Sequence, residues 1–175
     1  GCLKHMPGHG RATCDSHKAL PRVDAGDAEL AADIAPFASL AERAAIGMTA
    51  HIVFTEWDAD RPATQSPWVV ENIIRQRIGF DGLLLTDDID MQALDGTIPE
   101  RSVRALEAGC DLVLNCWAKL DDMAGIVEAC GAISSESAAR LDRALASVEL
   151  PESPADPDAL VAIRDTLFAA ADVAL

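Results

Sequence analysis

Histidine and aspartate side chains gather in one glycine-rich stretch near the start of the chain. All four histidines fall within the first 51 residues, and three of them lie in the run from Lys4 to His17. Gly8 and Gly10 allow backbone conformations that other residues avoid, so this loop can fold over a ligand. Asp15 stands two residues before His17, and a carboxylate close to an imidazole fixes its tautomer and raises its basicity. The pair is a candidate proton shuttle, with metal binding and a structural role as the alternatives.

A second candidate is the sequence Thr86-Asp87-Asp88, which directly follows a short apolar run. Adjacent carboxylates on an extended chain point to opposite sides, so at most one can face a common substrate directly. That aspartate could be a nucleophile, a metal ligand or a binder of substrate hydroxyls. The other is expected to cap a helix beginning at Ile89 or to hold a neighbouring residue.

The elements that must position these residues alternate between strands and helices. Strands are predicted at residues 1–4, 46–53, 82–86 and 111–114. Helices are predicted at about 25–43, 67–78, 99–108, 120–130, 136–148 and 158–171. Ser66 is the expected N-cap of the second helix, and Arg140 and Arg143 are expected on a solvated helix face. This alternation implies right-handed crossovers and a parallel sheet.

Polar residues follow each predicted strand, at the edge where parallel sheets carry their chemistry. They are Lys4 and His5, His51, Asp87 and Asp88, and Asn115 and Cys116. A complete (β/α)8 barrel needs about 250 residues, and this chain has 175. We therefore expect an α/β fold in the form of a partial TIM (β/α)8-like barrel with about four βα units. Residues 1–148 would form this half-barrel, and residues 149–175 a linker and a C-terminal helix.

Composition excludes several classes of partner. The formal net charge is −15, which repels nucleic acid and anionic membrane surfaces. No apolar run approaches the ~20 residues that cross a bilayer. The five cysteines are odd in number and form no CxxC pair, which favours reduced thiols and a cytoplasmic location. The chain also begins in the middle of a predicted strand, so we expect a fragment whose N-terminal half is missing.

The motifs together resemble the bacterial β-N-acetylhexosaminidases of glycoside hydrolase family 3. The resemblance covers residues 1–148, with Met6 where the family generally has phenylalanine. It is carried by KHMPGHG at 4–10 with DSH at 15–17, MTAH at 48–51, DRPAT at 60–64, GFDG at 79–82 with TDDIDM at 86–91, and ALEAGCD at 105–111.

The resemblance implies a TIM-like barrel that cleaves terminal β-linked N-acetylglucosamine from cell-wall fragments during peptidoglycan recycling, without a metal or another cofactor. The substrate would be an N-acetylglucosamine-containing muropeptide or a chitooligosaccharide-type compound. Asp87 would be the nucleophile, and the Asp15–His17 pair in a mobile loop would be the acid/base. Asp88 would support the nucleophile strand. The implied substrate-binding residues are Lys4, His5 and His51.

This assignment agrees with the chemistry of retaining glycosidases, which need a carboxylate nucleophile and a proton donor to the leaving oxygen. A histidine ordinarily has a pKa of about 6.5, so it needs little tuning at neutral pH. A loop can bring it to the substrate only after binding. Two other hypotheses remain open: a non-catalytic sugar-binding half-barrel, and a metal-dependent hydrolase. The metal ligands of the latter would be His5, His9, Asp15, His17 and Asp87.

Overall fold

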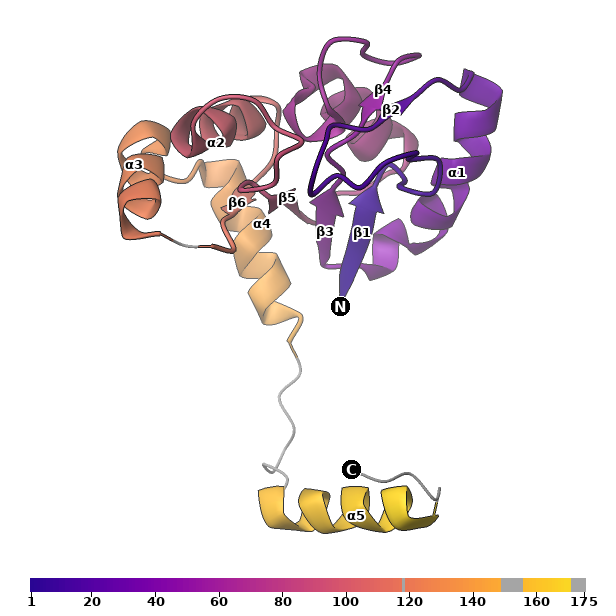
Figure 1. Ribbon diagram of the computed structural model, residues 1–175, viewed down its shortest axis with the longest axis vertical. Coiled ribbons are helices and arrows are strands. Elements are labelled where there is room, and N and C mark those ends of the chain that lie inside the picture. The colour runs from indigo at the N-terminus through magenta and orange to yellow at the C-terminus, as the bar shows by residue number, and fades with distance from the viewer. Residues whose placement is uncertain (118, 149–155, 171–175) are drawn as a thin grey trace.

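The computed structural model describes residues 1–117, 119–148 and 156–170. Its centre is a parallel sheet of four strands that lie side by side in chain order, with helices outside it (Figure 1). The strands are β1 (Cys2–Met6), β3 (Ile46–Thr49), β5 (Leu83–Asp88) and β6 (Leu112–Leu114). This confirms the predicted α/β fold, a part of a (β/α)8-like barrel.

Each region predicted to be helical contains a helix. The α-helices are α1 (Asp27–Leu40), α2 (Ile98–Glu107), α3 (Leu120–Cys130), α4 (Ser135–Ala146) and α5 (Pro157–Ala170). A π-helix, η3 (Val69–Arg77), precedes β5, and short 3-10 turns lie at η1 (Ala41–Arg43) and η2 (Ala63–Gln65). The Ser66 hydroxyl accepts a hydrogen bond from the Val69 amide at 3.2 Å, as expected of a helix cap.

Two predictions about local structure were wrong. The strand predicted at 46–53 is two strands, because β4 (Val53–Phe54) leaves the main sheet and pairs with β2 (Arg22–Val23). The Val53 amide donates to the Pro21 carbonyl at 3.0 Å, which draws the chain toward this second, two-stranded sheet. No helix begins at Ile89; the chain forms turns until α2 begins at Ile98.

The core lies between the sheet and its helices and depends on two glycines. Met6 and Phe80 are fully buried there. A Cβ atom at Gly47 would lie 2.3 Å from the Met6 Cε and 2.8 Å from the Phe80 Cζ. One at Gly82 would lie 2.6 Å from the Phe80 Cζ and 2.7 Å from the Ala45 carbonyl oxygen. Only residues without a side chain therefore let Phe80 pack this close to β3 and β5.

Within the described residues, no helix is long and apolar enough to cross a membrane. The linker predicted at the start of residues 149–175 lies largely outside the residues that the structure describes. Helix α5 matches the helix predicted at 158–171, whose last residue is also outside them. On α5, the side chains of Leu160, Ile163 and Leu167 are exposed.

A buried carboxylate, Asp111, ties the sheet to two helices. Its Oδ2 accepts hydrogen bonds from Arg75 of η3 and from the Leu84 amide of β5, both at 2.8 Å. Its Oδ1 accepts from Ser137 and Arg140 of α4, at 2.9 and 3.1 Å. Burial alone would raise the pKa of this carboxyl group, but these donors outweigh it and hold the pKa below the ordinary value for aspartate.

We predict that Asp111→Asn strongly destabilises the protein. The asparagine keeps the shape of the side chain but leaves Arg75 and Arg140, which are 11% and 14% exposed, without a buried counter-charge. Breaking such a pair typically costs about 3 kcal/mol or more. Urea unfolding should show this loss in the free energy of unfolding. Asp142→Asn, on the exposed side of α4, is the matched control and should change little. Equal stability of both variants would contradict the role of Asp111.

The same carboxylate should make stability depend on pH. Because the pKa of Asp111 is lowered by folding, its stabilisation is complete above the unfolded pKa of about 3.9 and is lost as pH falls through the folded value. Below pH ~4 the wild-type protein should therefore lose more unfolding free energy than Asp111→Asn does. Parallel losses in the two proteins would show that other carboxylates dominate acid unfolding.

Candidate active site

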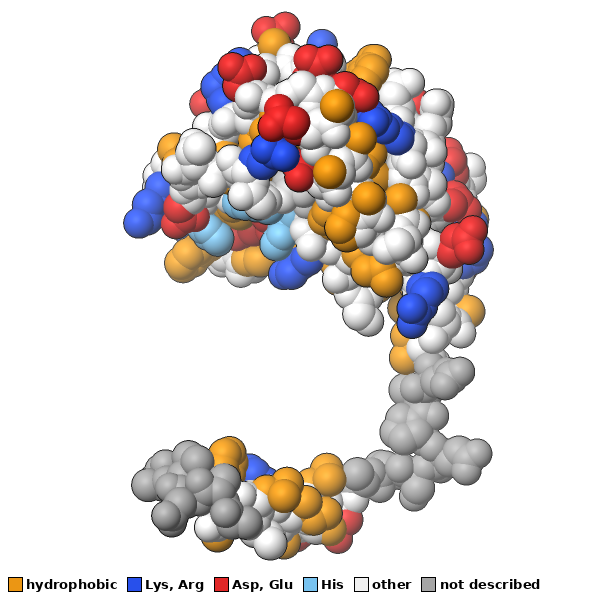
Figure 2. All heavy atoms as spheres, turned by 90° about the vertical axis from the view of Figure 1, so that its right-hand side faces the viewer, with side chains coloured by type: hydrophobic (Ala, Val, Ile, Leu, Met, Phe, Trp, Pro, Cys, Tyr) orange, Lys and Arg blue, Asp and Glu red, His pale blue; other side chains and the backbone are white. Residues whose placement is uncertain are grey.

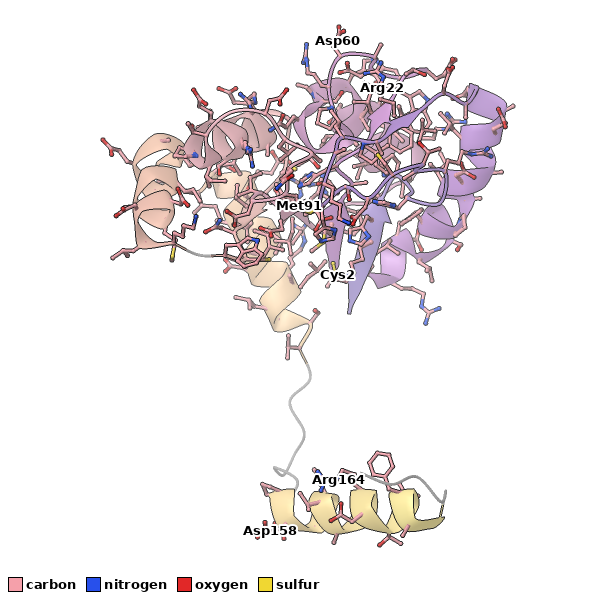
Figure 3. The ribbon with its side chains drawn as sticks, viewed as in Figure 1. Cys2, Arg22, Asp60, Met91, Asp158 and Arg164 are labelled. Atoms are coloured by element: carbon pink, nitrogen blue, oxygen red, sulfur yellow. The ribbon has the colours of Figure 1, made fainter. Side chains whose placement is uncertain are left out.

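The carboxyl ends of β1 and β5 bring two of the predicted residues together. The His5 Nε2 lies 3.5 Å from the Asp87 Oδ2, and their side chains are 28% and 17% exposed. The other Asp87 oxygen accepts a hydrogen bond from the Asp88 amide at 2.9 Å, which fixes the orientation of the carboxylate. Lys4, immediately before His5, is exposed. In Figure 3, Cys2 marks the start of β1 and Met91 the loop that follows β5.

His5 lies in an environment that disfavours its protonation. Partial burial is the main cause of a lowered pKa of His5. The negative charge of Asp87 opposes this effect, and the charge of Lys4 adds to it. At neutral pH His5 is therefore neutral. A neutral imidazole still donates one N–H, so His5 can donate from Nε2 to Asp87 while its other nitrogen accepts.

The Asp15–His17 pair forms in the loop between β1 and β2. The Asp15 Oδ1 accepts from the His17 backbone amide at 3.0 Å and from the His17 Nδ1 at 2.9 Å. The amide and the imidazole, in that order, lower the pKa of Asp15. Their side chains are 52% and 74% exposed, and histidines reach the surface among charged side chains in Figure 2. The bond to Nδ1 leaves the His17 Nε2 free to give or take a proton.

His51, a predicted substrate contact, is fully buried and has both ring nitrogens bonded within the protein. Burial lowers its pKa, so the ring is neutral. Its Nε2 lies 3.0 Å from the Asp88 carbonyl oxygen, which can only accept, so the proton is on Nε2. Its Nδ1 then accepts from the Thr64 hydroxyl at 2.7 Å. His51 is therefore linked to the site by its hydrogen bond to the backbone carbonyl of Asp88, the residue that follows Asp87.

Two residues that hold the end of β5 were missed at the level of sequence. Asp90 accepts hydrogen bonds from the Asn115 side chain at 2.5 Å and the Trp117 amide at 3.2 Å. Burial, followed by the charge of Asp88, raises its pKa. Arg101 of α2 donates to the carbonyls of Ile89 and Met91, at 3.0 and 3.2 Å. The third acid of the run Asp-Asp-Ile-Asp was the available signal for Asp90; nothing local marked Arg101.

Asp88 supports the same region, although not as the helix cap that was expected. Its Oδ1 accepts from the Asp90 amide at 3.2 Å and from the Cys116 amide, beyond β6, at 3.0 Å. The carboxylate therefore closes a turn after β5 and bridges to the neighbouring strand end. Of the two roles expected for the second aspartate of the pair, helix cap or support of a neighbouring residue, the geometry favours support for Asp88.

The five residues considered as metal ligands do not converge on one point. His5 faces Asp87, His9 contacts the Ser16 hydroxyl at 3.3 Å, and Asp15 pairs with His17. Across the residues that the structure describes, no group of three or more His, Cys, Asp and Glu side chains is arranged to hold a metal ion. The arrangement instead supplies a carboxylate and a separate imidazole–carboxylate pair, the groups that nucleophilic and acid–base catalysis require.

Comparison with known proteins gives, over most of the chain, the glycoside hydrolase family that the sequence motifs resemble. The family model described as the glycosyl hydrolase family 3 N-terminal domain matches residues 1–149. A β-hexosaminidase of Idiomarina loihiensis is 37% identical over 151 residues, which cover 82% of this chain and 44% of that protein. The chain thus spans less than half the length of this relative.

Solved structures agree. A glycoside hydrolase family 3 β-N-acetylglucosaminidase from Paenibacillus superposes with a TM-score of 0.77 at 31% identity, covering 89% of this chain and 33% of that one. NagZ from Neisseria gonorrhoeae, in complex with N-trifluoroacetyl-D-glucosamine, superposes with a TM-score of 0.71 at 36% identity, covering 82% and 41%. From its sequence, its fold and these matches, the chain belongs to glycosyl hydrolase family 3.

Proposed function

We propose that this chain carries the catalytic residues of a retaining β-N-acetylhexosaminidase that removes terminal β-linked N-acetylglucosamine. The observation that carries this proposal is the geometry of two acid–base sets at one edge of the sheet. Asp87 is held at the end of β5 against His5, and the Asp15–His17 pair lies on the loop that follows β1. The β-hexosaminidases and β-N-acetylglucosaminidases among its relatives support the choice of sugar.

The reaction proceeds in two displacements. Asp87 attacks the anomeric carbon, the bond from that carbon to the leaving oxygen breaks, and the His17 Nε2 gives its proton to that oxygen. The product is a glycosyl ester of Asp87. His17, now neutral, takes a proton from water; the water oxygen attacks the anomeric carbon and the Asp87 carboxylate leaves. Asp15 stays ionised because its pKa is lowered, so it stabilises the imidazolium form of His17.

The remaining assignments concern binding. Lys4 and His5 bind sugar hydroxyls, Lys4 through its exposed ammonium group and His5 through whichever nitrogen is not turned to Asp87. His51, first expected to contact the sugar, acts by holding the Asp88 carbonyl. Residues 1–148 contribute the C-terminal half of a barrel, and an N-terminal half completes the substrate pocket; this fits the 44% of the Idiomarina relative that the chain covers. Helix α5 lies beyond the half-barrel in the sequence.

Local charge favours the muropeptide over the neutral chitooligosaccharide as substrate. Lys4 and Lys18 are both exposed within residues 1–18, whereas Arg11 is paired with Asp33 and Glu29 of α1. The ammonium groups of these two lysines can attract the carboxylates of peptidoglycan fragments. The odd number of cysteines and their spacing favour reduced thiols, so we assign the protein a cytoplasmic role, in peptidoglycan recycling.

We predict that Asp87→Asn abolishes turnover, because an amide cannot form the glycosyl ester. In the natural polypeptide that contains this chain, release of p-nitrophenol from its β-N-acetylglucosaminide should fall on the order of a thousandfold or more. Asp95→Asn, an exposed aspartate in the loop beyond β5, is the matched control and should keep wild-type activity. Turnover that survives Asp87→Asn would refute the nucleophile. Sugar binding without turnover in the wild-type protein would favour the non-catalytic hypothesis.

We predict that the effect of His17→Ala depends on the leaving group. The value of kcat/KM reports the first displacement. In that step p-nitrophenolate can leave without being protonated, whereas the hydroxyl group of a sugar needs a proton from an acid to leave. The value for a natural disaccharide should therefore fall by roughly 10²- to 10⁴-fold, and that for the aryl glycoside far less. Azide needs no base, so it should restore kcat for the aryl glycoside by forming the glycosyl azide. Equal losses on both substrates, with no rescue by azide, would remove the proton-transfer role from His17.

A further inference from the structure

The loop that carries Asp15 and His17 turns a single side chain inward between them. Ser16 is 4% exposed, whereas its neighbours on both sides point into solvent. The Ser16 hydroxyl lies 3.3 Å from the Nε2 of His9, which belongs to the first part of the same loop. This hydrogen bond joins the two ends of the glycine-rich stretch across seven residues.

His9 is in turn placed against the proposed nucleophile site. Its ring meets the His5 ring edge to face, with the centroids 5.8 Å apart and the planes at 64°. His5 is the residue whose Nε2 lies 3.5 Å from Asp87. A continuous series of contacts therefore runs from Asp87 through His5 and His9 to Ser16, which lies between the two members of the exposed pair.

The other side of the loop is anchored separately. Arg11 donates to the Asp33 carboxylate of α1 at 2.5 Å and to Glu29 at 3.2 Å. The turn after Ser16 is closed by the Lys18 amide, which donates to the Asp15 carbonyl at 2.9 Å. Neither contact links the Asp15–His17 segment to β1 or β5. The His9–Ser16 hydrogen bond connects the segment to His9, whose ring packs against His5 of β1.

We propose that the His9–Ser16 hydrogen bond is a latch that holds the Asp15–His17 pair at the Asp87 end of the sheet, so that His9 and Ser16 are positioning residues. This inference rests on the acid–base role proposed for the pair. With the latch closed, the loop keeps His17 on the same side of the sheet as His5. With it open, His17 leaves the site while Asp87 stays in place on β5.

Hydrogen exchange tests the latch without reference to catalysis. In the natural polypeptide that contains this chain, the amides of residues 13–19 should exchange about three- to tenfold faster in Ser16→Ala, the range expected for loss of one hydrogen bond. His9→Phe keeps an aromatic ring against His5 but removes the nitrogen that bonds Ser16, so its amides should exchange as fast as those of Ser16→Ala. Ser16→Thr retains a hydroxyl and should stay close to wild type. Thr13→Ala removes an exposed hydroxyl from the same loop and is the control.

Kinetics give the second measurement. Ser16→Ala should lower kcat/KM for a substrate with a poor leaving group several-fold while leaving that for the p-nitrophenyl glycoside nearly unchanged, and Ser16→Thr should restore it. Unchanged exchange in both Ser16→Ala and His9→Phe would overturn the latch, whatever the enzyme does. Faster exchange with equal kinetic losses on both substrates would also overturn it as a positioning device. Failure of the proposed function is separate, because it appears as turnover that survives Asp87→Asn.

Discussion

The buried carboxylate of Asp111 is the contact on which the geometry of the sheet depends. A charge that is 2% exposed is costly unless every oxygen is paired, and its four donors come from η3, β5 and α4. The β5–β6 end of the sheet is therefore stable only when both helices are docked. One of the donors is the Leu84 amide, three residues before Asp87, so the anchor lies roughly 10 Å along the same strand from the proposed nucleophile.

A second set of contacts fixes the opposite end of β5. His51 holds the Asp88 carbonyl, the Asp88 and Asp90 carboxylates bridge to the backbone after β6, and Arg101 binds the carbonyls of the following turn. Asp87 thus sits on a strand that is anchored on both sides. The neutral state of the buried His51 ring is part of this arrangement, because only the Nε2–H form donates to a carbonyl while its Nδ1 accepts from Thr64.

Sequence predicted the features that depend on local pattern and missed those that depend on distant partners. The apolar runs located all four strands of the main sheet, and the Asp15–His17 contact followed from a spacing of two residues. The same apolar spacing suits an α-helix and a π-helix, so the form of η3 was not predictable. Arg140 was expected on a solvated face, but it is 14% exposed and binds Asp111, 29 residues away. The burial of His51 likewise depends on Thr64 and on Asp88 of another strand.

The contrast between a fixed carboxylate and an exposed imidazole suits the two steps of a retaining hydrolysis. The nucleophile forms and breaks a bond to the same anomeric carbon, so it benefits from a rigid support. The acid–base group must first reach the leaving oxygen and then a water molecule that takes its place, after the first product has departed. An acid–base residue fixed on a strand could reach both the leaving oxygen and the water only if the product left and the water entered past an immobile side chain. In the proposed mechanism, an imidazole on a loop that one hydrogen bond holds in place can give its proton, let the product leave and return for the water.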